Sequence, residues 1–406
     1  MLKICPSVSI LEDFLLMNSL FRNKNLNALV LSKNLVQYAL QMRVLFFSWL
    51  AYEVTQKDLW VGIVLGVGST PILLSSFLGS YLSEKFNIKK IMIFSNLLIF
   101  LLFSLFFFID YENIYNLLIL SLLFGIIMGV PSPPFWTIVI NTFGKNNLSK
   151  INSYFYSFQF FGEMIIPLVF AFIISNFSSN YFISFACFII LIATFLIYYF
   201  PEDKQLKNQK DKNIYDSFSK ILRENSVIFW MSIIVSIQSV FGVTIFIVLP
   251  QYANNFGVGA TGFGIFFAAN GAGIFLGTIF TFYTGIIKSK ILVLILSTMV
   301  WDIGQIIFAF STNYYLSIVV LFLIGFSAAY WVVAANLIFQ NETSEKNRNK
   351  IMAIYQFVTQ IFFIGWLVGG LISDLTNAQI ALVISGLSSY PIFIIALIFS
   401  KRLRIV

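Results

Sequence analysis

Residues 91–108 read IMIFSNLLIFLLFSLFFF, and this unbroken apolar run decides the class of fold. A helix of that length rises about 27 Å, close to the roughly 30 Å hydrocarbon core of a bilayer. A strand of a membrane barrel would instead alternate apolar and polar residues. Comparable runs recur along the 406-residue chain, which is 59% hydrophobic and 10% charged, whereas soluble proteins have about 25% charged residues. The sequence therefore predicts an all-α integral membrane protein, because backbone in lipid must satisfy its own hydrogen bonds.

The apolar runs predict twelve transmembrane helices in two sets of six. The first set is expected at residues 32–54, 60–82, 91–108, 114–137, 151–174 and 181–199. The second set is expected at 227–251, 261–286, 291–310, 315–339, 351–373 and 379–400. The chain accordingly divides into a cytoplasmic lead-in (1–26), an N-terminal six-helix bundle (27–200), a charged cytoplasmic linker (201–226) and a C-terminal six-helix bundle with a short tail (227–406).

The lead-in contains a short apolar run from Ile10 to Leu16, interrupted by Glu12 and Asp13. The run is too short to span a bilayer, and the two acidic residues argue against a signal peptide. A short helix lying on the membrane surface is expected here. A translation start at Met17 is the alternative explanation for this segment.

Positive charges identify the cytoplasmic side of the predicted helices. Of the 25 Lys and Arg residues, Lys57 alone falls in an outward connection and Arg43 alone lies deep inside a span, and the others lie in or at the edge of the termini and the even-numbered connections. Under the positive-inside rule both termini are cytoplasmic, and the protein is expected in the inner (plasma) membrane. The same rule accounts for the net charge of +8, so no nucleic-acid partner is expected.

Residue types that carry catalysis or bind metals are scarce. There is no His, and the two cysteines, Cys5 and Cys187, lie far apart in sequence. Neither a metal site nor a disulfide framework is expected, and the Gly-x-x-x-x-Gly-Lys-Ser/Thr motif of ATP-driven pumps does not occur. We therefore predict no cofactor, no metal and no enzymatic activity. The expected partners are the bilayer, a small-molecule substrate and protons or another coupling ion, and the protein is expected to be a monomer.

The two halves of the chain repeat one another weakly. The triplet Phe-Leu-Gly at 77–79 recurs at 275–277, and Gly125 matches Gly325, at a nearly constant offset of about 200 residues. Short basic connections recur at the same offset. This register predicts two parallel halves related by an axis along the membrane normal, an arrangement found in secondary transporters.

Three local motifs carry a resemblance to a known family. Residues 41–43 read QMR and residues 49–55 read WLAYEVT in the first predicted helix. Residues 80–90 read SYLSEKFNIKK after the second helix, and residues 162–167 read GEMIIP in the fifth. Through these motifs the chain resembles the major facilitator superfamily, and best its bacterial efflux branch, which includes macrolide and siderophore exporters. The resemblance implies the major facilitator fold, with two pseudo-symmetric six-helix bundles.

The loop after the second helix departs from the family signature Gly-x-x-x-Asp-Arg-Phe-Gly-Arg-Lys. Ser80 stands at its first position, and Asn87 and Ile88 replace a Gly and an Arg. The resemblance implies a cytoplasmic gate whose charges pair across the two halves in one conformation, formed by Glu84, Lys85, Lys89 and Lys90. The alternative for the last two lysines is that they only follow the positive-inside rule. The GEMIIP segment is similar to one found in efflux members, which favours antiport.

Charges inside the predicted spans are hypotheses of function, because burying a charge in a membrane is costly. Arg43 in the first span and Glu163 in the fifth both lie about 15–18 Å from the cytoplasmic end. The family resemblance places both helices beside a central cavity, so the two side chains are expected to face it close together. We expect Glu163 to be the proton-coupling residue and Arg43 to tune it. The alternative is a static ion pair that locks the N-terminal bundle.

Other polar and aromatic residues of the spans are assigned by helix. Those expected to line the cavity are Gln41, Trp136, Gln238, Asn270, Trp331, Asn336 and Gln360. The alternative for each of them is a packing or interfacial role. The proline-rich run at 130–134 is expected to break the fourth helix. Asp302 in the ninth helix is expected to contact Gln305 or Trp301, or to face a crevice on the lipid side.

The function predicted from these observations is ion-driven export of an amphipathic small molecule, such as a drug, a siderophore or a peptide-like metabolite. Two bundles would alternate around a site at mid-membrane, and a cavity with few charges and many aromatic rings suits a hydrophobic substrate. Uptake of a small nutrient by symport is the second hypothesis. A membrane scaffold or sensor that transports nothing is the third, and it belongs to another class.

Overall fold

The computed structural model describes residues 23–144, 148–200, 222–223, 225–284, 289–341 and 348–399. All of the secondary structure in these ranges is helical, which confirms the all-α class. Eleven candidate membrane spans are long and apolar enough to cross a bilayer, and the twelfth crossing is α2 (Lys24–Thr55), a helix of 32 residues. The expected surface helix of the lead-in and almost all of the charged linker lie outside the described residues.

The N-terminal half contains the first six crossings. In chain order its helices are α2 (Lys24–Thr55), α3 (Asp58–Lys85), α4 (Ile88–Leu105), α5 (Ile114–Gly129), α6 (Ser132–Phe143), α7 (Leu148–Asn176) and α8 (Ser179–Tyr198). Helices α5 and α6 together form the fourth crossing, and the break between them falls at Val130 and Pro131. The predicted break is confirmed, and its cause is that proline has no N–H group to continue the hydrogen-bond ladder.

The C-terminal half contains the other six crossings. Its helices are α10 (Ser226–Gly242), α11 (Thr244–Asn255), α12 (Gly259–Thr284), α13 (Lys290–Ala309), α14 (Tyr314–Asn341), α15 (Arg348–Gln360), α16 (Phe362–Leu375), α17 (Ala378–Leu387) and α18 (Ser389–Phe399). Three of these crossings are broken, at Val243, Ile361 and Ser388. These three breaks were not predicted from the sequence.

Asparagine side chains mark the start of many of these helices. Six of them accept a hydrogen bond from a backbone N–H of the first turn: Asn23, Asn87, Asn113, Asn225, Asn313 and Asn377. Such a cap satisfies donors that have no partner within the helix. Because each asparagine stands at the edge of an apolar run, it fixes where the crossing begins.

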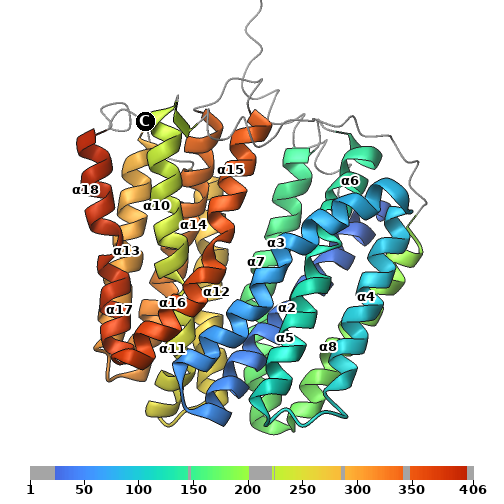
Figure 1. The fold of residues 1–406 in the computed structure, drawn as a ribbon, viewed down its shortest axis with the longest axis horizontal. Coiled ribbons are helices and arrows are strands. Elements are labelled where there is room, and N and C mark those ends of the chain that lie inside the picture. Colours follow the sequence, from blue (N-terminus) through green and yellow to red (C-terminus); the bar gives the residue numbers. More distant parts are fainter. Residues whose placement is uncertain are drawn as a thin grey trace, which may run out of the picture.

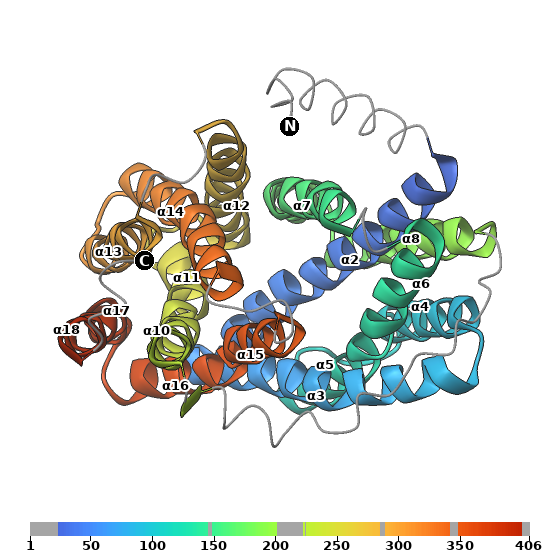
Figure 2. The same cartoon turned by 90° about the horizontal axis from the view of Figure 1, so that it is seen from above.

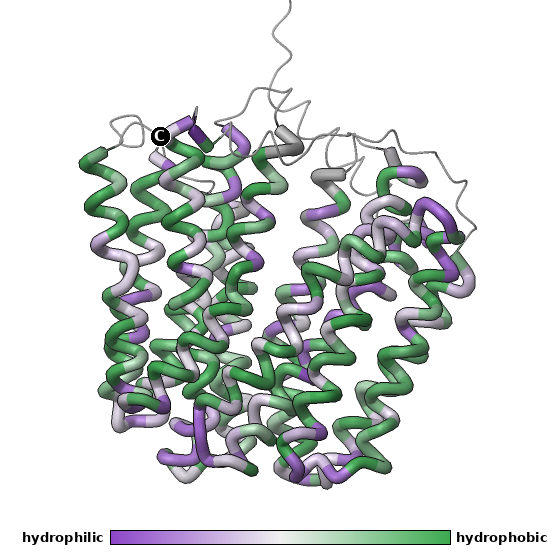
Figure 3. Tube along the Cα trace, viewed as in Figure 1, coloured by the Kyte–Doolittle hydropathy of each residue, from purple (hydrophilic) through white to green (hydrophobic). Residues whose placement is uncertain are grey.

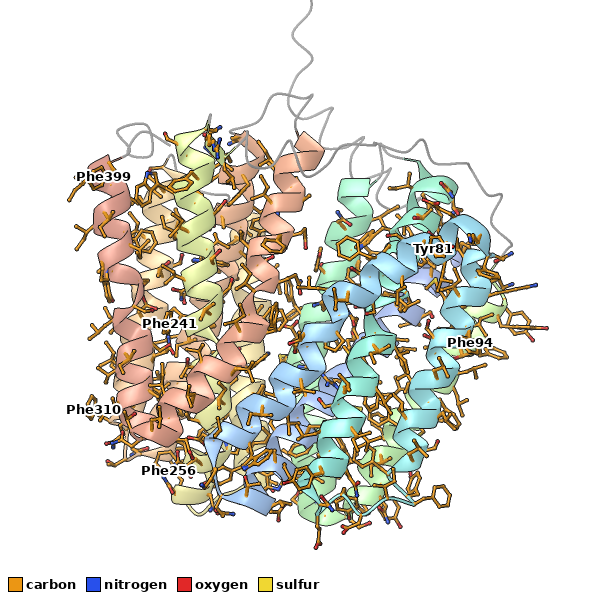
Figure 4. All side chains as sticks on the ribbon, in the orientation of Figure 1. Tyr81, Phe94, Phe241, Phe256, Phe310 and Phe399 are labelled. Atoms are coloured by element: carbon orange, nitrogen blue, oxygen red, sulfur yellow. The ribbon has the colours of Figure 1, made fainter. Side chains whose placement is uncertain are left out.

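The outer surface of the molecule suits a bilayer. Phe94 and Phe399 are exposed and project outward from opposite flanks (Figure 4). Hydrophobic residues extend along the crossings, and hydrophilic residues gather toward the two ends (Figure 3). In a bilayer these aromatic and aliphatic side chains contact lipid and not water, which is favourable, so the exposed apolar area is a membrane surface.

The two halves share one apolar core at one end and have separate cores at the other. The shared core includes Phe170 of α7 and Phe263 of α12, whose ring centroids are 5.9 Å apart. The separate cores contain residues such as Phe135 in one half and Phe339 in the other. We call the end with separate cores, where α8 ends and α10 begins, the linker end. The end where α3 begins and α16 ends is called the far end.

Helix packing follows the same division. Between the halves, α3 packs against α16 and α7 packs against α12. The two groups of helices lie side by side when seen from above (Figure 2). Their axes meet at the far end and diverge toward the linker end (Figure 1). The residues at the α3–α16 and α7–α12 contacts are therefore the ones that any relative movement of the halves must disturb.

Candidate transport site between the two halves

The contact between α7 and α12 brings Glu163 to the surface that the halves share. Gly271 of α12 has no room for a side chain, because the carbonyl group of Glu163 occupies the position of a Cβ atom. Gly264, two turns away, packs in a similar way on Pro167 and Ala171. Small residues let two helix backbones approach closely. Movement of one half against the other therefore displaces Glu163 from α12.

The side chain of Glu163 is half-buried and has neutral partners. Its Oε1 accepts a hydrogen bond from Gln159 Nε2 at 3.2 Å, one turn earlier on α7. Gln41 Nε2 of α2 donates to the backbone carbonyl of Glu163 at 3.4 Å. In the described part of the chain Glu163 forms no ion pair. Glu163 is thus a half-buried carboxylate without a paired cation at the contact between α7 and α12.

The predicted closeness of Arg43 to Glu163 is wrong. Arg43 is 2% exposed inside the N-terminal half, where its Nη1 donates to Ser121 Oγ at 3.3 Å and its guanidinium lies over the ring of Phe124. Residues two apart on a helix project about 200° from each other. Because Gln41 faces α7, Arg43 faces α3 and α5. The alternative of a static Arg43–Glu163 ion pair is wrong for the same reason.

Helices α3 and α16 meet at the far end through glycines and one hydrogen bond. Gly62 has no room for a side chain, because the carbonyl oxygen of Trp366 fills that position, and a Cβ on Gly370 would lie 3.0 Å from the carbonyl oxygen of Asp58. Asp58 is 5% exposed, and its Oδ2 accepts a hydrogen bond from Ser373 Oγ at 2.6 Å. Asp58 and Ser373 therefore join the two halves while the far end is closed.

This far-end contact was not predicted from the sequence. Asp58 precedes the predicted span at 60–82, and an acidic residue at that place is already explained by the positive end of the helix dipole. A usable signal was the spacing of small residues. Gly62 and Gly66 lie on one face of α3, and Gly369 and Gly370 form a small patch on α16, which is the composition of a close helix contact in a membrane.

Replacement of Ser373 by Ala is expected to favour opening of the far end. The change leaves the buried carboxylate of Asp58 without its hydroxyl donor, and the loss of one partner of a buried polar group costs about 1–3 kcal/mol. The closed population should therefore fall about 5- to 150-fold relative to the open one. Spin labels at the exposed positions Gln56 and Leu375, in a background without native cysteines, would report the distance between the halves.

A matched control for this experiment is Ser69→Ala. Ser69 is also buried on α3, but its hydroxyl donates to the carbonyl of Leu65 in the same helix. Its removal should leave the distance distribution unchanged. The interpretation of the Asp58–Ser373 bond would be contradicted if Ser373→Ala and Ser69→Ala gave the same distribution as the unsubstituted protein.

The cavity candidates Gln41, Gln238 and Asn270 each form a hydrogen bond to a neighbouring helix. Gln41 lies at the α2–α7 contact beside Glu163. Gln238 Nε2 donates to Asp302 Oδ1 at 3.4 Å, and Asn270 Nδ2 donates to the carbonyl of Leu321 at 3.3 Å. Both of these side chains are buried and directed toward α13 or α14 of their own half. The prediction that Gln238 and Asn270 line a cavity is therefore wrong, because their amides join helices within one bundle.

The other four cavity candidates are half-buried: Trp136, Trp331, Asn336 and Gln360. Trp136 packs edge-on against Phe135 and Phe155 in the separate core of the N-terminal half. The buried Nε1 of Trp331 has no hydrogen-bond partner, and Asn336 accepts a hydrogen bond from Gln340. Gln360 is the last residue of α15, next to the break before α16. Their contact with substrate stays a prediction.

The predicted gate residues lie at the end of α3 and the start of α4, at the linker end. Lys85 Nζ lies 4.4 Å from the ring centroid of Tyr81, and Lys89 Nζ lies 5.6 Å from that of Tyr198. Both rings belong to the same half as the lysines, and Glu84 and Lys90 are exposed. In this conformation the halves meet at the far end and are apart at the linker end, where these charges lie. Pairing of these charges across the halves therefore stays a prediction.

Asp302 is enclosed within the C-terminal half. It has an exposed fraction of 0%, and it accepts hydrogen bonds from Gln238 of α10 and Ser389 of α18. The expected crevice on the lipid side is wrong, because α10 and α18 cover this face of α13. A carboxylate buried among neutral side chains is an unusual feature of a membrane protein.

Two six-crossing halves that meet at one end, with the carboxylates of Asp58 and Glu163 at the contacts between them, are the architecture of a membrane transport protein. Comparison with known proteins agrees. The sequence profile of the Major Facilitator Superfamily matches residues 31–363, and the chain belongs to this superfamily. It is therefore a multi-pass membrane transporter for a small molecule, and it is not an enzyme. No curated protein sequence matches it.

Crystal structures of other transporters share the fold. Nucleoside transporter NupG is 15% identical, with 93% of this chain and 98% of that chain covered and a TM-score of 0.68. A POT family transporter in complex with 5-aminolevulinic acid is 12% identical, with 93% and 96% covered and a TM-score of 0.75. A D-xylose-proton symporter is 14% identical, with 90% and 95% covered and a TM-score of 0.67. Identities this low establish the fold alone.

Proposed function

We propose that the protein is a proton-coupled exporter of an amphipathic small molecule, such as a drug, a siderophore or a peptide-like metabolite. The observation that carries this proposal is the position of Glu163. It is a half-buried carboxylate with neutral partners, and its backbone lies on the contact between α7 and α12. Alternating access opens and closes this contact in each cycle.

A proton on Glu163 changes the charge at the surface where the halves meet. Removal of a charge from water without a counter-ion is unfavourable, and the free energy of that burial differs between the closed and the open contact. Proton binding and conformation are therefore linked, and the linkage is reciprocal. Arg43 does not take part directly, because it faces away from this contact.

The chemistry around the contact supports an amphipathic substrate. Ring pairs join the halves on both sides of Glu163, with centroids 5.7 Å apart for Trp49 and Phe263 and 5.8 Å apart for Phe161 and Phe275. These rings offer apolar faces, and the side-chain amides of Gln41 and Gln159 near Glu163 offer hydrogen bonds. Such a mixture is typical of small-molecule sites. The half-buried candidates toward the linker end are proposed to complete the path: Trp136, Trp331, Asn336 and Gln360.

We further propose that the linker end faces the cytoplasm and the far end faces the outside of the inner membrane. The support is the distribution of Lys and Arg, which the positive-inside rule connects with the cytoplasm. When the linker end closes, the charges of the signature loop are proposed to pair across the halves. The six-helix bundles at 27–200 and 227–406 are then the two bodies that move.

Transport in membrane vesicles of defined orientation tests this function. Inside-out vesicles with an acidic interior should accumulate ethidium, a macrolide or a siderophore, and each active compound should release protons from the interior. Right-side-out vesicles should not accumulate these probes. Accumulation driven by external protons in right-side-out vesicles would instead establish uptake by symport. Absence of flux in both orientations, with folded protein present, would favour a scaffold or sensor.

A further inference from the structure

Two broken crossings of the C-terminal half meet around Asp302. Helix α10 ends at Gly242 before α11 begins, and after the break at Ser388 helix α18 begins at Ser389. Ser385 Oγ of α17 donates to the carbonyl of Phe241 in α10, and Ser389 Oγ donates to Asp302 Oδ2. The two breaks therefore lie beside each other, with the carboxylate of α13 next to both of them.

Asp302 has hydrogen bonds but no balancing charge. Its Oδ1 accepts from Gln238 Nε2 at 3.4 Å, and its Oδ2 accepts from the Ser389 hydroxyl. Among the residues that the structure describes, no Lys or Arg forms an ion pair with it. Buried carboxylates are normally paired with a cation or coordinate one. Because neutral groups enclose Asp302, either a bound proton or a bound cation must balance its charge.

Gln305 supplies a second, independent observation. Its exposed fraction is 0%, and neither amide atom has a hydrogen-bond partner. On a helix it projects between the directions of Trp301 and Asp302, one turn closer to the far end. Helices α10 and α13 run in the same direction, from the linker end to the far end. Gln238 and Asp302 are hydrogen-bonded, so they lie at the same depth along the two helices. Gln305, one turn after Asp302, therefore lies at the depth where α10 ends. A buried amide with no partner is rare and requires an explanation.

The end of α10 adds polar groups at the same level. Gln238 Nε2 and Trp301 Nε1 each lie 3.5 Å from the position that a Cβ atom of Gly242 would take, and Trp301 Nε1 has no partner either. The last carbonyl oxygens of a helix carry partial negative charge. In transporters, the carbonyl ends of broken helices can coordinate a sodium ion. The end of α10 therefore lies beside the polar side chains of Gln238 and Trp301, at the level of Gln305.

The matching crossings of the N-terminal half lack this arrangement. Helices α2 and α8, which correspond to α10–α11 and α17–α18, are continuous. Between α4 and α8 the polar contact is Ser104 Oγ with Cys187 Sγ at 3.8 Å, and it contains no carboxylate. Helix packing in this fold does not require a buried acid at this place, so the cluster is a feature of the C-terminal half.

We propose that this cluster binds a sodium ion. The ligands are oxygen atoms of Asp302, Gln305 and Ser389 together with the carbonyl end of α10, and hard cations prefer such oxygen ligands. No group of three His, Cys, Asp or Glu suited to a metal occurs in the described ranges, so the single carboxylate matches a monovalent cation. The site joins three crossings within one half and is separate from Glu163.

Thermal unfolding of the purified full-length protein tests the sodium site, because a ligand that binds the folded state raises the unfolding temperature. Sodium chloride is compared with choline chloride at equal ionic strength. Sodium should raise the unfolding temperature to a plateau. Asp302→Asn should weaken the apparent sodium affinity about tenfold or more. Ser104→Ala, the matched variant in the N-terminal half, should leave the sodium response unchanged.

Gln305→Leu keeps the proposal testable if Asp302→Asn does not fold. Leu is similar in size and removes a buried amide that has no partner, so the sodium-free protein should be at least as stable as before. The same variant should lose most of the sodium response. Equal unfolding temperatures of the unsubstituted protein in sodium and choline, or a full sodium response in Gln305→Leu, would overturn the proposal. Sensitivity to pH without sensitivity to sodium would also overturn it.

Discussion

Glu163→Gln is expected to abolish proton-driven transport while leaving the fold intact. Gln is close to Glu in size and can keep the hydrogen bond with Gln159, but it cannot exchange a proton in the cycle. In inside-out vesicles with an acidic interior, the substrate should therefore equilibrate and not accumulate. Substrate-induced release of protons should fall to the level of vesicles without the protein. The measurements are accumulation of the active probe and the internal pH of the vesicles.

Two controls separate coupling from a general loss of activity. Glu53→Gln removes an exposed carboxylate of α2 near the far end and should transport normally, whereas Glu163→Asp should retain part of the coupling. A readout that needs no substrate is the distance between spin labels at Gln56 and Leu375. It should depend on pH in the unsubstituted protein and not in Glu163→Gln. Accumulation by Glu163→Gln at the normal level would exclude the proposed role.

Gly62→Ala is expected to shift the protein strongly toward an open far end. The added methyl group would occupy the position of the Trp366 carbonyl oxygen, which is backbone and cannot rotate away. Overpacking of this kind costs about 1–3 kcal/mol, and that cost falls on the closed conformation alone. The closed population should drop about 5- to 150-fold relative to the open one, and transport should slow because the cycle must pass through the closed state.

Gly242→Ala is the matched control for this substitution. A Cβ atom on Gly242 would have its nearest neighbours at 3.5 Å, which is ordinary van der Waals contact, so the spin-label distances should not change. Gel filtration and thermal unfolding would show that both variants are folded. If Gly62→Ala gave the same distances as Gly242→Ala, the close approach of α3 and α16 would not control the conformation.

Hydropathy could predict the twelve crossings because each crossing passes through the hydrocarbon core of the bilayer, which requires a continuous run of apolar residues. The span expected at 181–199, for example, is α8 (Ser179–Tyr198). Breaks were harder to predict. Pro71 and Pro167 lie inside continuous helices, since neighbouring groups in a bundle can satisfy the freed backbone, while the break at Val243 has no proline.

The sequence determines the position of a residue along its helix better than the direction in which its side chain points. Counting residues placed Glu163 near the middle of its span, and Glu163 lies near the middle of α7 (Leu148–Asn176), because the rise per residue is constant. The direction of Arg43 was wrong because the rotation of a helix depends on its neighbours. Contacts between the halves were also out of reach, since Asp58 and Ser373 are 315 residues apart and the internal repeat relates equivalent helices but gives no register across the interface.

The uneven distribution of helix breaks gives the two halves different mechanical properties. In the described part of the chain, one crossing of the N-terminal half is interrupted, against three in the C-terminal half. Each interruption removes backbone hydrogen bonds that resist bending. The N-terminal half is therefore expected to behave as a stiff lever, and the C-terminal half as the compliant partner that absorbs deformation. Two bundles with the same order of crossings would then bend to different extents during the conformational change.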